Sequence, residues 1–208
     1  MSNQRENIEN VLEKYIPKAA VPICTDWIIH YKVFVDITKK RAYKYGDYRA
    51  PYKGSTHKIT INHDLNPYQF LLTFVHEMAH LMAHVQHGAY IQSHGKEWKM
   101  IFSHVMQHVF NLNVFPHDVQ KALVTHMQNP KYSSCADENL MRVMRNYDKA
   151  EHKRIVVEEL PIGCVFELDI GKTFIKGEKL RKNYSCIEKS TGRKYTVHPL
   201  AEVKRVIE

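Results

Sequence analysis

Two histidines and a glutamate stand close together in the middle of the chain, in the order His76-Glu77-Met78-Ala79-His80. On a helix, residues four apart lie one turn along and about 40° apart around the axis, so both imidazoles can reach one ion. Neutral imidazole is a common zinc ligand, and a glutamate directly after the first histidine can take a proton from water that the ion activates. The pentapeptide therefore predicts a zinc-dependent hydrolase, with His76 and His80 as metal ligands and Glu77 as the catalytic base.

A catalytic zinc site needs a third protein ligand and an open position. The metzincin spacing would place a third histidine where the chain has Gln86, so that arrangement is excluded. His84 and His87 continue along the same helix and are too far from an ion held by the first two histidines. Beyond a short reversal of the chain, His94 is the favoured third ligand because it stands at the start of the next helix. Glu97 is the alternative.

The residues around the pentapeptide have the pattern of a helix with two different faces. Asn66-Pro67 is typical of a helix start and Gly88 of a helix stop. A second helix is expected from about His94-Gly95 to Phe110. The first helix carries an apolar stripe of Leu71, Phe74, Val75, Met78, Met82 and Val85, opposite a polar stripe of Gln69, Thr73, His76, His80, His84 and His87.

The elements that flank these helices predict an α+β fold. Residues 3–16 and 20–31 are expected to be helices, and residues 33–38, 41–49 and 57–62 strands of a small sheet, antiparallel in part. The later part of the chain changes from a helical connector with a turn at Asn129-Pro130 to short β-rich runs separated by glycines. The predicted organisation is a metallopeptidase domain at 1–112, a helical connector at 113–160 and a small all-β module at 161–208.

The charge of the chain is concentrated at its two ends. The formal net charge is +8. Residues 1–60 hold 11 Lys/Arg against 6 Asp/Glu, or +5, and residues 161–208 hold 10 against 6, or +4. Such an excess favours polyanions, of which nucleic acid is the commonest, although a solvated surface has the same composition. The densest group is predicted to form a nucleic-acid or substrate rim: Lys39, Lys40, Arg41, Lys44, Arg49 and Lys53.

A second basic region interleaves lysines and arginines with aromatic residues in the C-terminal module. Single-stranded nucleic acid is often held by such a combination of charge and stacking, and an ordinary solvated sheet face is an equally good explanation. The residues concerned are Lys172, Lys176, Arg193, Lys194 and Tyr195 with the run Lys179-Leu180-Arg181-Lys182-Asn183-Tyr184.

The cysteines and the apolar runs indicate a cytoplasmic protein. No apolar stretch of about 18 or more residues predicts a membrane span, and the N-terminal residues do not have the pattern of a signal peptide. The four cysteines are widely separated and are expected to be reduced thiols. No Cys-x-x-Cys pair is present, so the usual ligand spacing of a zinc ribbon is missing.

The combination of the pentapeptide with His94-Gly95-Lys96-Glu97-Trp98 resembles the SprT-like family of zinc metallopeptidases, which includes the Spartan-type proteases. Trp27 and the segments 41–46 and 59–62 resemble its upstream portion, and the resemblance covers roughly residues 20–112. It implies a zincin-like fold in which His76, His80 and His94 bind one zinc ion. Spartan-type members cleave proteins crosslinked to DNA, which would suit the basic ends. Single Cys164 and Cys186 depart from the paired cysteines with which many bacterial relatives end.

Two hypotheses about function follow. The favoured one is a cytoplasmic zinc peptidase that hydrolyses peptide bonds of protein substrates, with DNA-associated proteins as candidate targets and nucleoid association as a consequence. The alternative is a DNA-binding accessory protein with a structural zinc and little or no turnover. An open coordination position separates the two. The sequence does not predict the oligomeric state.

Overall fold

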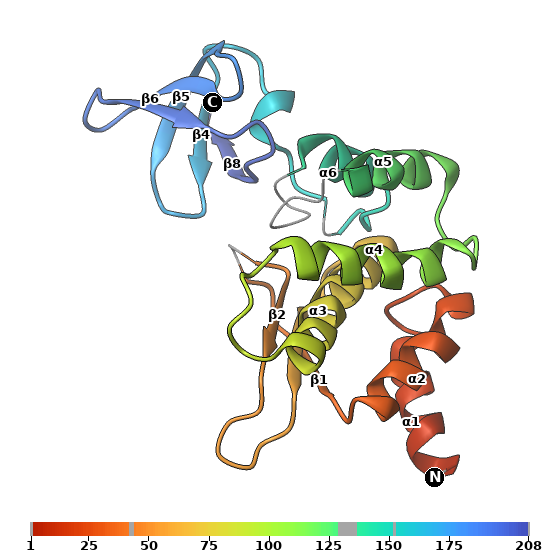
Figure 1. Ribbon diagram of the computed structural model, residues 1–208. Coiled ribbons are helices and arrows are strands. Elements are labelled where there is room, and N and C mark those ends of the chain that lie inside the picture. Colours follow the sequence, from red (N-terminus) through yellow and green to blue (C-terminus); the bar gives the residue numbers. More distant parts are fainter. Residues whose placement is uncertain (1, 42–43, 129–136, 152, 208) are drawn as a thin grey trace. The chain divides into compact units, whose positions relative to one another are not determined.

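A three-stranded sheet and the helices around it make up the first part of the computed structural model, which describes residues 2–41, 44–128, 137–151 and 153–207 (Figure 1). The strand order is β1-β3-β2, with β1 parallel and β2 antiparallel to the central β3. This confirms a small sheet that is antiparallel in part. The elements are α1 (Ser2–Leu12), α2 (Val21–His30), β1 (Phe34–Thr38), β2 (Gly46–Arg49), β3 (Lys58–Asn62), α3 (Pro67–His87), α4 (Lys96–Phe110), α5 (His117–Gln128) and α6 (Glu138–Arg145).

The longest helix, α3, begins and ends where its capping residues predict. The side chain of Asn66 accepts a hydrogen bond from the backbone N–H of Gln69 at 3.0 Å, and Pro67 occupies the first turn. Gly88 ends the helix with φ 82°, a left-handed conformation that glycine adopts without steric cost. Both predicted boundaries are confirmed. They could be predicted because helix capping depends only on residues next to the helix end.

The two-striped description of α3 needs a correction. Gln69 and Thr73, from the expected polar stripe, are buried, whereas Val85, from the apolar stripe, is 52% exposed. The helix packs against β2 and β3 of the sheet and also against α4, so most of its circumference is covered. A helix in the middle of a domain buries polar residues as well, and only its last turn emerges.

Several other helix and strand boundaries differ from the predicted ones or lie outside the described residues. Helix α1 ends at Leu12, four residues before the expected end, and the chain continues in turns to Ile16. The strand expected over 41–49 is observed from Gly46 to Arg49, and residues 42–43 lie outside the described part. The turn expected at Asn129-Pro130 also lies outside the described residues.

The C-terminal residues form a separate five-stranded antiparallel sheet in the order β7-β6-β5-β4-β8. The last strand, β8, returns to pair with the first, β4, so the sheet is a four-stranded meander extended by one strand, and the small all-β module is confirmed. Its core contains Val157, Phe166, Phe174, Cys186 and Val203. The strands are β4 (Val165–Leu168), β5 (Thr173–Lys179), β6 (Tyr184–Glu188), β7 (Lys194–Val197) and β8 (Val203–Ile207).

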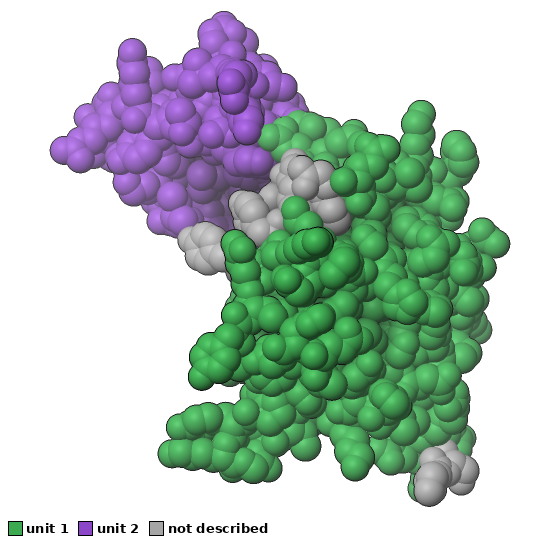
Figure 2. All heavy atoms as spheres, in the orientation of Figure 1, with its two compact units in different colours: residues 1–149 green, residues 150–208 purple. Residues whose placement is uncertain are grey.

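The chain divides into two units, residues 1–149 and residues 150–208 (Figure 2). Helices α5 and α6 thus group with the first unit, and their buried residues join its core, Leu123 and Leu140 among them. Within the described residues, no helix combines the length and the apolar character needed to cross a membrane.

Candidate metal centre

The first two histidines of the centre come from successive turns of α3. The Nε2 atoms of His76 and His80 lie 3.3 Å apart, as the spacing of four residues on a helix predicts. Helix α3 packs against the sheet and against α4, and residues four apart on it project to the same side, so both imidazoles point to one place.

The third histidine is His94, which reaches the pair from a position two residues before the start of α4. Its Nε2 lies 3.1 Å from that of His76 and 2.9 Å from that of His80. His94 has φ 59°, a left-handed conformation that non-glycine residues rarely adopt, and Gly95 follows it as the N-cap of α4. Such strained backbone is found at sites where the position of a side chain matters.

Glu97 does not join this cluster. Among the described residues, the only group of three or more potential ligand side chains with all ligand atoms within 4.8 Å of one another is His76, His80 and His94. Of the two alternatives for a third ligand, His94 and not Glu97 lies in this cluster.

Trp98 forms an apolar floor under the three imidazoles. Its ring centroid lies 4.7 Å from those of His76 and His94 and 5.2 Å from that of His80. It is fully buried and stacks on Phe102 with the rings 4.8 Å apart. Trp98 thus keeps water from one side of the centre.

The imidazoles are held in the neutral form that binds metals. Burial, together with the smaller effects of His80 and His94, lowers the pKa of His76 to about 2. Burial also lowers the pKa of His80 to about 4, assisted by His94, and lowers that of His94. Because the charged form is disfavoured at all three, their lone pairs are free for a cation at neutral pH.

The geometry of the three nitrogens fits a tetrahedral ion. With metal–nitrogen distances of about 2.0–2.1 Å, neighbouring ligand nitrogens of such an ion are roughly 3.3–3.4 Å apart. The observed separations of 2.9–3.3 Å come close to this value. Three converging imidazole nitrogens cannot all satisfy one another by hydrogen bonds, whereas one cation satisfies all of them.

Glu77 lies beside the centre under strand β2 and is only 7% exposed. Burial raises the pKa of its carboxyl to about 8, and the charge of Asp47 adds to the effect, while the backbone N–H of Tyr48 stabilises the carboxylate. Asp47 itself keeps its charge despite partial burial, because hydrogen bonds from Lys44 and Arg49 hold its pKa below the ordinary value. Glu77 is thus a carboxyl that can change protonation near neutral pH.

Gly46 makes room for this glutamate. A Cβ atom at Gly46 would lie 2.7 Å from Oε1 of Glu77 and 2.6 Å from Cγ2 of Thr73, closer than real contacts allow. The strand can therefore pass directly over the carboxyl only with glycine at this position. The contact of Gly46 could not be predicted, because no local pattern in the sequence shows which residue a strand will cross.

Three further aromatic and imidazole side chains continue the site along α3, one turn beyond His80. The hydroxyl of Tyr48 lies 2.9 Å from Nδ1 of His57, and the ring of His84 lies about equally far from both rings, at 6.2 and 6.0 Å. Burial raises the pKa of Tyr48 to about 12, so its hydroxyl remains protonated. Of these residues, only His84 had a signal in the sequence, its helical spacing from His80.

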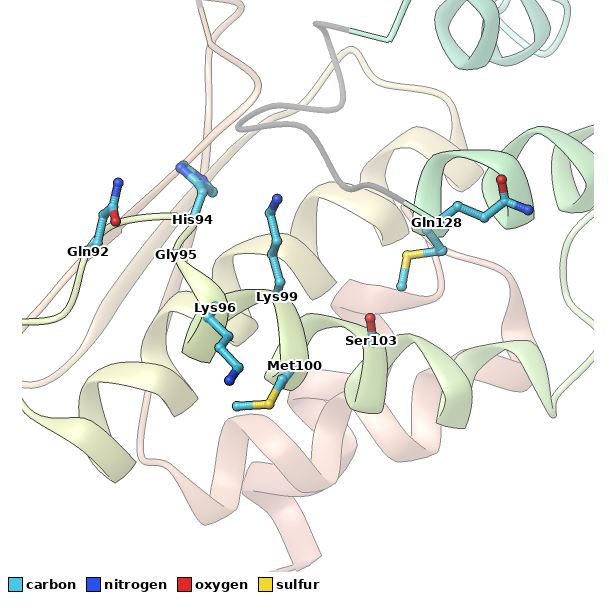
Figure 3. Close-up of a pocket in the computed structure, with 9 residues that line it drawn as sticks. Gln92, His94, Gly95, Lys96, Lys99, Met100, Ser103 and Gln128 are labelled. Carbon is cyan, nitrogen blue, oxygen red and sulfur yellow. The ribbon is translucent and has the colours of Figure 1, made fainter.

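A cavity of about 840 Å³ opens beside His94. Figure 3 shows its lining, which extends from Gln92 and His94 along α4 to Ser103, with Gln128 of α5 on the other side. Lys96 and Lys99 both contribute to this lining. The centre is therefore not sealed on its His94 side, and a ligand can approach it there.

The predicted basic rim is made of residues with different surroundings. Arg41 donates to Oδ1 of Asn62 and Oγ1 of Thr60, so it braces the sheet. Lys44 and Arg49 both pair with Asp47, at 2.8 and 3.0 Å. Lys40 lies 3.8 Å from Asp64, and Lys39 and Lys53 are exposed.

In the C-terminal sheet, two lysines of the predicted nucleic-acid surface have partners within the module. Nζ of Lys172 lies 2.9 Å from Glu188, and Lys176 is buried, with its ammonium group donating to the carbonyls of Glu158 and Leu160. Cys164 and Cys186 are free thiols.

Comparison with known families gives one result. Residues 29–121 match the model of the SprT-like family. Comparison with curated proteins and with solved structures gives no significant match. The matched range contains the strands of the first sheet, α3, α4 and all three converging histidines.

Proposed function

From the premise that this chain contains a SprT-like domain at residues 29–121, we propose that it is a zinc-dependent peptidase with Glu77 as catalytic base. The observation that carries the proposal is the convergence of the Nε2 atoms of His76, His80 and His94, within 3.3 Å of one another, beside a buried carboxyl. Three protein ligands leave a tetrahedral ion one open position, which a hydrolytic site requires and a closed structural site lacks.

The histidines would hold the ion, and the other residues would move protons and position the substrate. A zinc ion bound there would polarise the scissile carbonyl, acidify the attacking water and favour the carboxylate form of Glu77. Glu77 takes a proton from the attacking water and passes it to the nitrogen of the leaving amine. Trp98 and Phe102 exclude water from below, which strengthens the electrostatic interactions at the centre.

Strand β2 offers an edge to which an extended substrate can pair. The backbone N–H of Asn62 donates to the carbonyl of Tyr45 at 2.9 Å, so alternation along an antiparallel ladder directs the peptide groups of Gly46 and Tyr48 away from β3. Both groups lie at the edge of the sheet that faces away from β3, where the N–H of Tyr48 already contacts the carboxyl of Glu77. A polypeptide aligned there passes the catalytic carboxyl in a regular extended conformation.

Proteins associated with DNA are the substrate class that we favour. The first 60 residues, which include the start of this domain, carry a net charge of +5, and Lys39 and Lys53 are exposed. Phosphate contacts by such lysines would bring the peptidase to its substrates without reading a sequence.

The test compares wild-type protein with the Glu77→Gln variant on an unfolded protein and on a DNA-bound protein. Glutamine has the same size but cannot accept the proton, so cleavage is expected to fall by about 10²–10⁴-fold at equal zinc content. Equal cleavage by both proteins would contradict the role of Glu77. Absence of cleavage by either protein, together with a fourth protein ligand on the zinc, would favour the alternative of a DNA-binding accessory protein with a structural zinc.

A further inference from the structure

The sheet of the first unit has a second free edge, formed by β1. The order β1-β3-β2 places β1 on the side opposite to the strand that covers Glu77. The N–H of Phe34 donates to His57, and the carbonyl of Thr38 accepts from His63, so residues 34, 36 and 38 face β3. The peptide groups of Val35 and Ile37 therefore face outward.

These outward groups have no backbone partner among the described residues outside the ladder with β3. Exposed strand edges of this kind are usually protected by a lysine, a proline or a bulge. Between Phe34 and Thr38 the strand contains no lysine, proline or bulge, and its one charged side chain, Asp36, pairs with Lys58 of β3 at 2.8 Å. The edge is thus able to accept another strand.

A cavity of about 880 Å³ runs along this edge, between β1 on one side and α1 and the end of α2 on the other. Its lining is mostly apolar, and three of its residues are unusually exposed: Val11 at 44%, Ile29 at 37% and Phe34 at 57%. A groove between a strand edge and a helix is a geometry that binds extended peptides. The strand supplies main-chain hydrogen bonds, and the helix side receives alternate side chains.

The charge of the groove favours a partner with an acidic residue. Lys32 is the one charged side chain among the described residues that line the cavity, and no carboxylate lies there. Lys32 is exposed, and within the described part of the chain no carboxylate forms an ion pair with it. A partner with an acidic residue at the matching end would gain a charge-assisted contact without displacing an internal one.

We propose that the groove between α1 and β1 binds an extended segment of a partner protein, which adds to β1 as a fourth strand. The segment carries aliphatic residues at alternate positions, directed at Val11 and Ile29, and a carboxylate beside Lys32. The site is independent of the metal centre because it uses the other edge of the sheet. It therefore holds whether or not the chain cleaves peptide bonds.

The test begins with random twelve-residue peptides displayed on phage and selected on the full chain. Peptides that also bind the Val11→Lys variant are removed, so that only ligands of the groove remain. The expected ligands have Val, Ile or Leu at positions two apart and an acidic residue at one end. Selection on Lys32→Glu is expected to replace that acidic residue by a basic one.

Synthetic copies of the selected peptides then locate the contact. Affinity is expected to fall at least tenfold for Val11→Lys and to stay unchanged for Val124→Lys, a matched control because Val124 is 51% exposed on α5, outside the groove. Hydrogen exchange at the amides of Val35 and Ile37 is expected to slow on binding. Failure to select any peptide, equal affinity of the two lysine variants, or unchanged exchange at both amides would overturn the proposal.

Discussion

The histidines of the first unit and the lysines of the second were both predicted from residue type and spacing to bind ligands. Their surroundings in the structure are opposite. His76, His80 and His94 turn their ring nitrogens toward one point and leave room for a cation. Lys172 and Lys176 turn toward Glu188 and toward backbone carbonyls of their own module. The three histidines are thus arranged to bind a ligand, whereas the two lysines bind groups of their own module.

The difference comes from what the surroundings provide. Around the histidines, burial and mutual repulsion disfavour charge, so each nitrogen keeps a lone pair that only an external cation satisfies. Around Lys172, a carboxylate on the neighbouring strand is already in contact. A group of like residues without internal partners is therefore a better sign of a site than a group of mixed charges.

The largest effect is expected from two glycines that occupy equivalent close contacts in the two units. Gly46→Ala would push Glu77 away and lower the cleavage rate by about 100-fold, since small displacements of a catalytic group have such costs. Gly177→Ala would force the added Cβ against the carbonyl oxygen of Ser185, only 2.6 Å away, and lower the unfolding temperature of the second unit. Cleavage assays, zinc analysis and calorimetry distinguish these outcomes.

The two substitutions should have separate effects, Gly46→Ala on cleavage and Gly177→Ala on stability. Gly46→Ala is expected to keep its zinc, because the histidines do not touch Gly46, and Gly177→Ala is expected to cleave within about twofold of wild type. A loss of cleavage by Gly177→Ala, with the cleavage rate of Gly46→Ala unchanged, would contradict the assignment of the catalytic residues to the first unit.

A smaller effect concerns the stability of the zinc-free protein and its dependence on pH. The pKa of Glu77 is about 8 when folded and near 4.5 when unfolded, so folding takes up a proton between these values. The contribution of Glu77 to the free energy of unfolding is therefore fully present below pH 4.5 and is lost as the pH rises through about 8. Glu77→Gln removes the loss and is expected to unfold roughly 2–4 °C higher than wild type at pH 8.5.

The control is the same pair of proteins at pH 5.5, after removal of zinc by a chelator. The histidines lose stability there as the pH falls below 6.5, since their pKa values are lowered by folding, but they do so in both proteins. The difference in unfolding temperature should therefore shrink. A difference that does not change with pH would contradict burial as the cause of the raised pKa.

The smallest effect is expected in DNA binding. Lys39→Ala and Lys53→Ala should each reduce the affinity for a double-stranded DNA fragment a few-fold and the salt slope by about 1, whatever the DNA sequence. Lys172→Ala should change neither, because its ammonium group is paired with Glu188. Fluorescence anisotropy over a range of salt concentrations measures both quantities, and a larger effect of Lys172→Ala would restore the second unit as the binding surface.

The parts of the structure that could be predicted are those with local causes. The limits of α3 followed from Asn66, Pro67 and Gly88, and the pairing of His76 with His80 followed from the helical repeat. The contact of Gly46 with Glu77 and the position of Tyr48 depend on which strand lies over the helix, and no local pattern carries this information. For the same reason the inward direction of Lys176, which depends on strand register and on a distant loop, could not be predicted.

The central claim is that His76, His80 and His94 hold one ion with an open position, and the visible spectrum of the cobalt(II)-loaded protein tests it most directly. Four-coordinate cobalt gives intense bands and six-coordinate cobalt weak ones, so the spectrum reports the geometry of the site. Wild type is expected to show intense bands that saturate at one equivalent and to lose them in His94→Ala. His104→Ala is the control, since exposed His104 and His108 also have Nε2 atoms 3.3 Å apart. Bands that persist in His94→Ala, or that disappear in His104→Ala, would contradict the three-histidine centre.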